Sequence, residues 1–188
     1  MGEIIPQIEK RRARRALSEK PISDEILGRI MTAATYAPSC FNNQPWRFLV
    51  VNRDRELEIV KNNLSGGNYW AKKAPVIVLV FTKPELDCRL SDKRDYAFFS
   101  VGLAVQNLIL QATEEGLIAH PIAGYKPLPL KEAFNVDSQM ILLTLVIIGY
   151  PGDEAHLNDN HREQEHSARD RKPEEQVILY NRWAEAEA

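Results

Sequence analysis

The chain has 188 residues, of which 44% are hydrophobic and 27% are charged, and its formal net charge is −2. This composition is typical of one globular domain spanning residues 1–188, and it excludes a disordered chain or one with an overall attraction to nucleic acid. No apolar run approaches the roughly 20 residues that cross a bilayer, and the N-terminus lacks a secretory signal, so we expect a cytoplasmic protein without a membrane segment.

The first third of the chain predicts two helices, a strand and a further short helix. A helix-like segment runs from Ile4 to Leu17. Ser23 is a suitable N-cap for a second helix, which should stop before Pro38 because a proline disfavours helical backbone in the residue before it. Residues 46–51 read as a strand, and residues 55–62 as a short polar helix.

The remaining pattern predicts a buried sheet with a long central helix. A turn at residues 66–68 precedes an apolar, β-branched strand at residues 76–81. Asp95 opens a helix that is apolar on nearly all sides and that ends at Gly116. A second buried strand covers residues 140–150, and a polar extension follows over about residues 152–188. Without regular β-α-β alternation, this is an α+β fold with helices against a sheet.

A basic cluster, Lys10-Arg11-Arg12-Ala13-Arg14-Arg15, lies in the first predicted helix. On a helix, Arg11 and Arg15 would share one face, where two guanidinium groups can grip a phosphate. A solvated helix face explains the same pattern equally well. A nucleic-acid-binding arm is a third interpretation, although no aromatic residues are interleaved with the arginines.

The segment Ala37-Pro38-Ser39-Cys40-Phe41-Asn42-Asn43-Gln44-Pro45-Trp46 joins the second helix to the first strand. Two prolines restrict this loop, and its amides and hydroxyl offer both donors and acceptors. Such a loop suits the recognition of a heterocycle whose edge alternates donors and acceptors. A simple capped turn is the alternative.

The cysteines and histidines give few independent signals. Cys40 and Cys88 are the only cysteines, and we expect two reduced thiols, with Cys40 serving in packing. The five-residue spacing of His156, His161 and His166 does not converge on one ion, so we expect a solvated tail and no metal site. His120 is open to two interpretations, a substrate contact or a hydrogen-bonded structural histidine.

The loop from Ala37 to Trp46 resembles the most recognisable signature of the nitroreductase family, Ala-Pro-Ser-x-x-Asn-x-Gln-Pro-Trp. The arginine cluster resembles that family's N-terminal Arg-x-Ser-x-Arg element. The resemblance continues in order through most of the chain, at Asn68-Tyr69-Trp70, Pro121-Ile122-Ala123-Gly124-Tyr125 and Arg169-Asp170-Arg171. It implies an α+β homodimer with a central, mainly antiparallel sheet, one FMN in each of two clefts between subunits, and a C-terminal extension that reaches over the partner.

The resemblance also implies which residues bind the cofactor. The phosphate would be held near the N-terminus, where Ala13 departs from the family's usual serine, and by a C-terminal basic pair. The loop before the first strand would lie against the flavin ring from the partner subunit, and a short backbone segment would face the reactive ring nitrogen. The implied residues are Arg11, Arg12, Ala13, Arg15, Pro38, Ser39, Cys40, Asn42, Gln44, Asn68, Pro121, Ile122, Ala123, Gly124, Arg169 and Arg171.

The implied function is an NAD(P)H-dependent FMN oxidoreductase that reduces nitroaromatic, quinone or similar small acceptors by a ping-pong mechanism. The flavin carries the chemistry, so no catalytic protein residue is expected. One alternative is a specialised family member, such as a reductive dehalogenase or a flavin-modifying enzyme. Another is a flavin-binding or storage protein without significant turnover.

Overall fold

The computed structural model describes residues 4–183 and contains one four-stranded sheet in the order β1-β2-β4-β3. All three pairings are antiparallel, which confirms the expected α+β fold with a mainly antiparallel sheet. The strands are β1 (Arg47–Val51), β2 (Val76–Thr82), β3 (Ile118–Ile122) and β4 (Ile141–Gly149).

Strand β2 is central and buried along its whole length. Because side chains alternate across a strand, Val76, Val78 and Val80 point to one core cluster while Ile77 and Leu79 point to another. This arrangement explains why residues 76–81 are continuously apolar instead of alternating.

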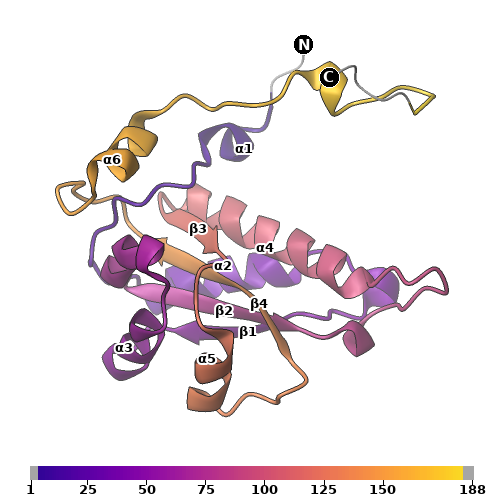
Figure 1. Ribbon diagram of the computed structural model, residues 1–188, viewed down its shortest axis with the longest axis horizontal. Coiled ribbons are helices and arrows are strands. Elements are labelled where there is room, and N and C mark those ends of the chain that lie inside the picture. The colour runs from indigo at the N-terminus through magenta and orange to yellow at the C-terminus, as the bar shows by residue number, and fades with distance from the viewer. Residues whose placement is uncertain (1–3, 184–188) are drawn as a thin grey trace.

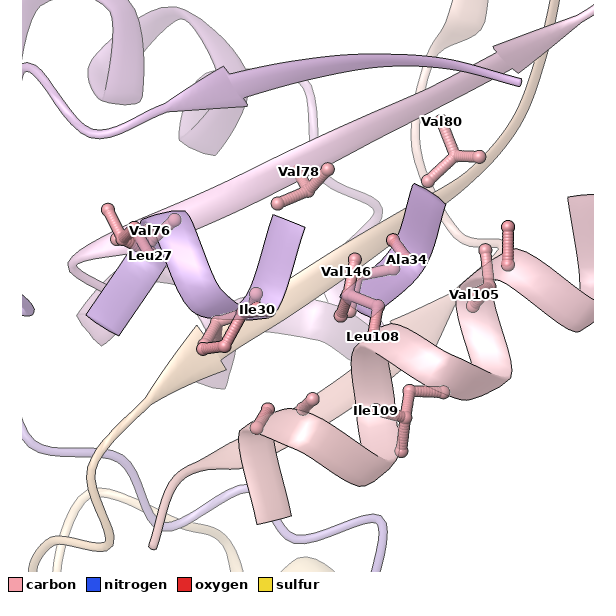
Figure 2. Packing of buried hydrophobic residues seen from close by; sticks show 14 of the residues in the cluster. Leu27, Ile30, Ala34, Val76, Val78, Val80, Val105, Leu108, Ile109 and Val146 are labelled. Carbon is pink, nitrogen blue, oxygen red and sulfur yellow. The ribbon is translucent and has the colours of Figure 1, made fainter. Parts of the chain in front are cut away.

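Two helices cover one face of the sheet (Figure 1). Helix α2 (Asp24–Thr35) begins at Ser23, whose Oγ accepts a hydrogen bond from the backbone of Ile26, and helix α4 (Tyr96–Glu114) ends before Gly116, which adopts a left-handed φ of 73°. Figure 2 shows Ile30 of α2 and Leu108 of α4 packed beneath the sheet. These boundaries confirm the sequence prediction for both helices.

Shorter elements cover the opposite face. They are α3 (Asp54–Asn62), α5 (Pro127–Ala133) and a 3₁₀ helix over Gly66–Lys73. Trp70 of the 3₁₀ helix and Leu130 of α5 are buried in the second core cluster. Three further 3₁₀ turns lie at Cys40–Asn42, Pro84–Leu86 and Glu174–Gln176.

The N-terminal helix is much shorter than its sequence pattern predicts. Helix α1 covers only Pro6–Lys10, and the chain is then extended as far as Leu17, which pairs with Pro151. Arg11 and Arg15 therefore do not share a helix face, and that part of the prediction is wrong. Tertiary contacts of the extended segment replace the helical hydrogen bonds.

Strand β3 and helices α5 and α6 were not predicted. Strand β3 contains Pro121, which argues against a central strand, but β3 lies at the sheet edge, where a missing N–H is tolerated. Helix α6 (Asp159–His166) forms within the polar extension and is capped by the side chain of Asn158. Beyond α6, the chain runs clear of the sheet and passes beside α1 (Figure 1).

Helix α4, with 19 residues, is by length and composition the one helix of residues 4–183 that could cross a membrane. The expectation that no apolar run approaches that length is therefore wrong. Its buried residues, among them Val101, Ala104 and Leu108, pack into the domain core, which is the placement expected of a core helix.

The two cysteines form a disulfide, with 6.0 Å between their Cα atoms, so the expectation of reduced thiols and of simple packing by Cys40 is wrong. Their separation of 48 residues in the sequence gave no sign of this. The pairing arises because the chain leaving β2 passes the loop that precedes β1, the strand next to it.

Candidate functional site

Basic side chains from the two ends of the chain gather around the extended N-terminal segment. The pKa of Arg11 is lowered, first by burial and then by the positive charges of Arg169, Arg171 and Arg12. Within residues 4–183, none of the ion pairs uses these four arginines or Arg15. A group of cations without a carboxylate partner is suited to hold an anion.

The C-terminal extension fixes this segment through backbone contacts. The guanidinium of Arg169 donates to the carbonyls of Ile8, Glu9 and Arg11 at 3.1, 2.7 and 2.7 Å. The buried carboxylate of Glu165 accepts from the backbone N–H of Arg15. Sequence reasoning placed no role on Glu165, whose burial depends on the fold of α6.

Arg15 lies beside a tilted pair of aromatic rings. Its guanidinium carbon is 5.9 Å from the centroid of Trp70, whose ring is 4.7 Å from that of His120. The ring of His120 also bonds through Nδ1 to the carbonyl of Arg14 at 3.0 Å. Burial, and then the charges of Arg15 and Arg11, lower the pKa of His120 to about 4, so its ring is neutral at pH 7.

Asn68 and the backbone that follows β3 meet next to these rings. The side-chain amide of Asn68 donates to the carbonyl of Gly124 at 2.9 Å, and the backbone N–H of Ser65 donates to the same oxygen at 3.0 Å. A Cβ on Gly124 would lie 2.5 Å from that amide, so a larger residue here would displace the Asn68 side chain from its hydrogen bond. The neighbouring Pro121 and Ala123 are exposed, whereas the Ile122 side chain is in the core and leaves only its backbone available.

The loop between α2 and β1 forms a second group of the expected residues. Phe41, Asn42 and Gln44 have φ values of 47°, 58° and 49°, a left-handed backbone conformation that residues other than glycine rarely adopt. Ser39 Oγ accepts from the backbone of Gln44 at 2.9 Å, and the Gln44 amide donates to the Asn42 carbonyl at 3.3 Å. Such local strain held by side-chain bonds is a feature of functional sites.

The two groups lie at opposite ends of α4. Gln7 of α1 bonds to Glu114 at the C-terminal end of that helix. Pro38, Ser39 and Cys40 instead line a cavity together with Tyr96 and Phe99 at its N-terminal end. Among the hydrogen bonds and ion pairs of residues 4–183, none joins the clustered arginines to the Pro38–Gln44 loop.

One group within residues 4–183 has a metal-like arrangement, formed by Cys40, Asp87 and Cys88, whose ligand atoms lie within 4.8 Å of one another. The sulfur atoms are bonded to each other, and metal ligation requires thiolates. His156 has both ring nitrogens buried without a hydrogen-bond partner, and His161 stacks on Tyr69 at 5.4 Å. These two histidines are therefore held within the fold and are not solvated as the sequence suggested.

The described part of the chain thus combines an α+β domain with four arginines that form no ion pair and with a glycine turn held by Asn68. Comparison with known proteins identifies the family of this domain. The model of the Nitroreductase family matches residues 8–65 and 57–150, and the chain belongs to that family.

Individual relatives agree with this assignment. A protein of Archaeoglobus fulgidus, which carries the provisional name NADH dehydrogenase/NAD(P)H nitroreductase, is 30% identical over 82% of this chain and 88% of its own. The iodotyrosine deiodinase of Thermotoga neapolitana is 28% identical over 77% of this chain and 86% of its own. A crystal structure described as an oxidoreductase containing FMN superposes with a TM-score of 0.87 and 28% identity, covering 98% of this chain and 95% of the other.

Proposed function

We propose that this protein is an FMN-dependent oxidoreductase that takes reducing equivalents from NADH or NADPH and transfers them to small oxidised acceptors. The supporting observation is the cluster of arginines without carboxylate partners on a nitroreductase fold. Nitroaromatic compounds and quinones are the proposed acceptors, and use of one site by donor and acceptor in turn implies ping-pong kinetics.

The residues of the arginine half-site fit the cofactor. Arg11, Arg12, Arg169 and Arg171 would hold the phosphate, because their positive charges repel one another unless an anion lies between them. Ala13 has no hydroxyl, so the backbone would supply a donor at that position. Exposed backbone at Pro121 and Ala123, together with Ile122 and Gly124, would face the ring.

When bound, FMN accepts hydride from the nicotinamide and passes two electrons to the acceptor. The protein would bind the cofactor, orient it and set the charge around its ring. Arg15 is the proposed cation beside the ring, where a positive charge favours an anionic reduced form. Trp70 and the neutral His120 hold Arg15 without adding a competing charge, and Asn68 keeps the glycine turn in place.

We infer that the complete site requires a homodimer. The loop that carries Pro38, Ser39, Cys40, Asn42 and Gln44 contacts the N-terminal end of α4, whereas α1 bonds to the C-terminal end, so a partner subunit would supply the loop. Exposed apolar side chains are consistent with such an interface, among them Phe41 at 92%, Val177 at 61% and Trp183 at 86% exposure. The extension from residue 167 onward would lie over the partner.

A reductive dehalogenase is the second candidate, because a deiodinase is among the relatives. The segment between Tyr69 and Asp95 is taken up by the 3₁₀ helix, β2, one short turn and a small hairpin before α4, which leaves no room for a long lid over a specific substrate. We therefore favour a general reductase. Turnover with an iodinated phenol but not with a quinone would reverse this order.

An absorbance spectrum before and after anaerobic NADH or NADPH tests the function. We expect flavin bands that bleach with a nicotinamide and return when a quinone is added. A colourless protein that FMN does not reconstitute would contradict the proposal, particularly if it binds DNA in a salt-dependent way. Bleaching without reoxidation by any acceptor would instead indicate flavin storage. We place the protein in the cytoplasm, where reduced nicotinamides are available.

Mixing two defective variants tests the divided site. Arg11→Ala damages the arginine half, and Pro38→Trp places bulk on the exposed loop of the other half. A mixed dimer has one intact site, so random re-pairing should restore about a quarter of the sites. A homodimer of either variant alone has no intact site. If no sites return, although mass spectrometry detects mixed dimers, the site is contained within one chain.

A further inference from the structure

The Cys40–Cys88 disulfide lies in the wall of a cavity of about 470 Å³. One wall is the Pro38–Cys40 loop, and another is the chain that leads into α4, represented by Leu90 and Arg94. Side chains at the start of α4, including Phe99, form the base. Cys40 is one of the residues that line this cavity, which places the disulfide beside a space that a small molecule can enter.

The wall that contains Cys88 is a small hairpin, residues 88–96, held mainly by its own contacts. Arg89 pairs with Asp95 in a β-bridge, and the N–H of Leu90 donates to the carbonyl of Arg94 at 3.3 Å. The ion pair of Arg94 is also internal, with Asp92 at 2.7 Å. In Figure 1 this loop projects from the domain before α4. The disulfide is therefore one of its few links to the body.

Asp87 provides a second link that does not depend on the sulfur atoms. Its buried carboxylate accepts from Ser100 Oγ at 2.7 Å, from the Asn43 amide at 3.2 Å and from the backbone of Cys88 at 2.8 Å. These bonds keep the two cysteine-bearing segments adjacent when the disulfide is broken. The carboxylate also lies within 4.8 Å of both sulfurs, where its negative charge disfavours two thiolates and so favours closure of the bond.

We propose that the Cys40–Cys88 pair is a reversible redox site, reduced by a small dithiol that enters the cavity, and that its oxidation state determines how firmly the hairpin closes that cavity. A thiolate of the dithiol attacks Cys40 Sγ and releases Cys88 as a thiol. The second thiol of the reductant then displaces Cys40. Two electrons and two protons pass to the protein, and the reductant leaves as a cyclic disulfide. Cys40 also belongs to the loop proposed to face the partner's flavin, but the thiol–disulfide exchange itself needs no flavin, so the test below can fail without contradicting the proposed function.

The test uses the folded full-length protein and dithiothreitol as the dithiol. Thiols are counted by alkylation and intact mass, and amide exchange is followed in residues 88–95, with β2 as an internal reference. We expect two new thiols per chain, at least tenfold faster exchange in the hairpin and unchanged exchange in β2. Removal of dithiothreitol and addition of its oxidised form should reverse both changes.

A double variant, Cys40→Ser with Cys88→Ser, should show the fast hairpin exchange at all times and no response to dithiothreitol. The proposal is overturned if the native disulfide resists reduction until the protein is denatured, because the bond is then purely structural. It is also overturned if the purified protein contains two free thiols that the oxidised reagent does not close. Reversible reduction with unchanged amide exchange in the hairpin would refute the proposal that the disulfide determines how firmly the hairpin closes the cavity.

Discussion

His120 should make the stability of the folded protein depend on pH in a defined direction. Burial and the nearby arginines lower its pKa from 6.5 to about 4 in the folded state, so between these values the unfolded chain binds the proton and the folded protein does not. Stability is therefore complete above about pH 6.5 and is lost as the pH falls towards 4. The difference between the two pKa values corresponds to at most about 3 kcal/mol.

Urea unfolding at several pH values between 7 and 4 measures this effect. His120→Gln retains an amide that can donate to the Arg14 carbonyl, and it should lose markedly less stability over this range than the native protein. His161, whose pKa is also lowered, mainly by burial, should leave a smaller dependence of unfolding stability on pH in His120→Gln. His166→Gln, at an exposed position, serves as the matched control. Equal slopes for the native protein and His120→Gln would refute the reasoning.

Four further measurements test other parts of the structure. Leu108→Ala removes a fully buried side chain between α4 and the sheet, and urea unfolding should show a loss of about 2–5 kcal/mol. Reduction of the Cys40–Cys88 bond, which spans 48 residues, should lower unfolding stability by up to about 4 kcal/mol from chain entropy, measured with and without reductant. Arg169→Ala removes three hydrogen bonds to backbone carbonyls, so fluorescence titration should show FMN affinity at least tenfold weaker, and Arg169→Lys should recover part of it. Arg15→Ala should lower both FMN retention and the flavin reduction potential, and a potentiometric titration without change would contradict its assigned role.

The core elements could be predicted from sequence because local and tertiary preferences agree in them. Residues 76–81 are apolar because β2 is buried on both faces, and α4 is apolar almost all round because it lies within the core. Ser23 marks a helix start through the hydrogen bond accepted by its hydroxyl, and Gly116 marks a helix end through its left-handed backbone. In each case the signal is contained within a few neighbouring residues.

The N-terminal segment could not be predicted because distant residues determine its backbone. Residues 11–15 have good helical propensity, yet Glu165 and Arg169, 150 and 158 positions from the residues they contact, bind the backbone there in an extended form. The disulfide and the burial of Asp87 depend in the same way on strand order. Recognition of the loop signature identified candidate residues and implied that the loop acts from the partner subunit, whereas no local sequence pattern shows which candidates lie near one another in one chain.

This separation follows from the fold and gives the divided site a physical reason. Helix α4 spans the domain as a single buried rod, so the segments packed at its two ends cannot approach each other without unfolding the core. The arginine half contains the positive charge and the pinned glycine turn, whereas the loop half contains strained backbone and exposed aromatic surface. Each half lacks what the other offers to a flavin. In the proposed homodimer, a second copy of the chain would supply the missing half at both sites at once, because a twofold arrangement makes the two contacts equivalent.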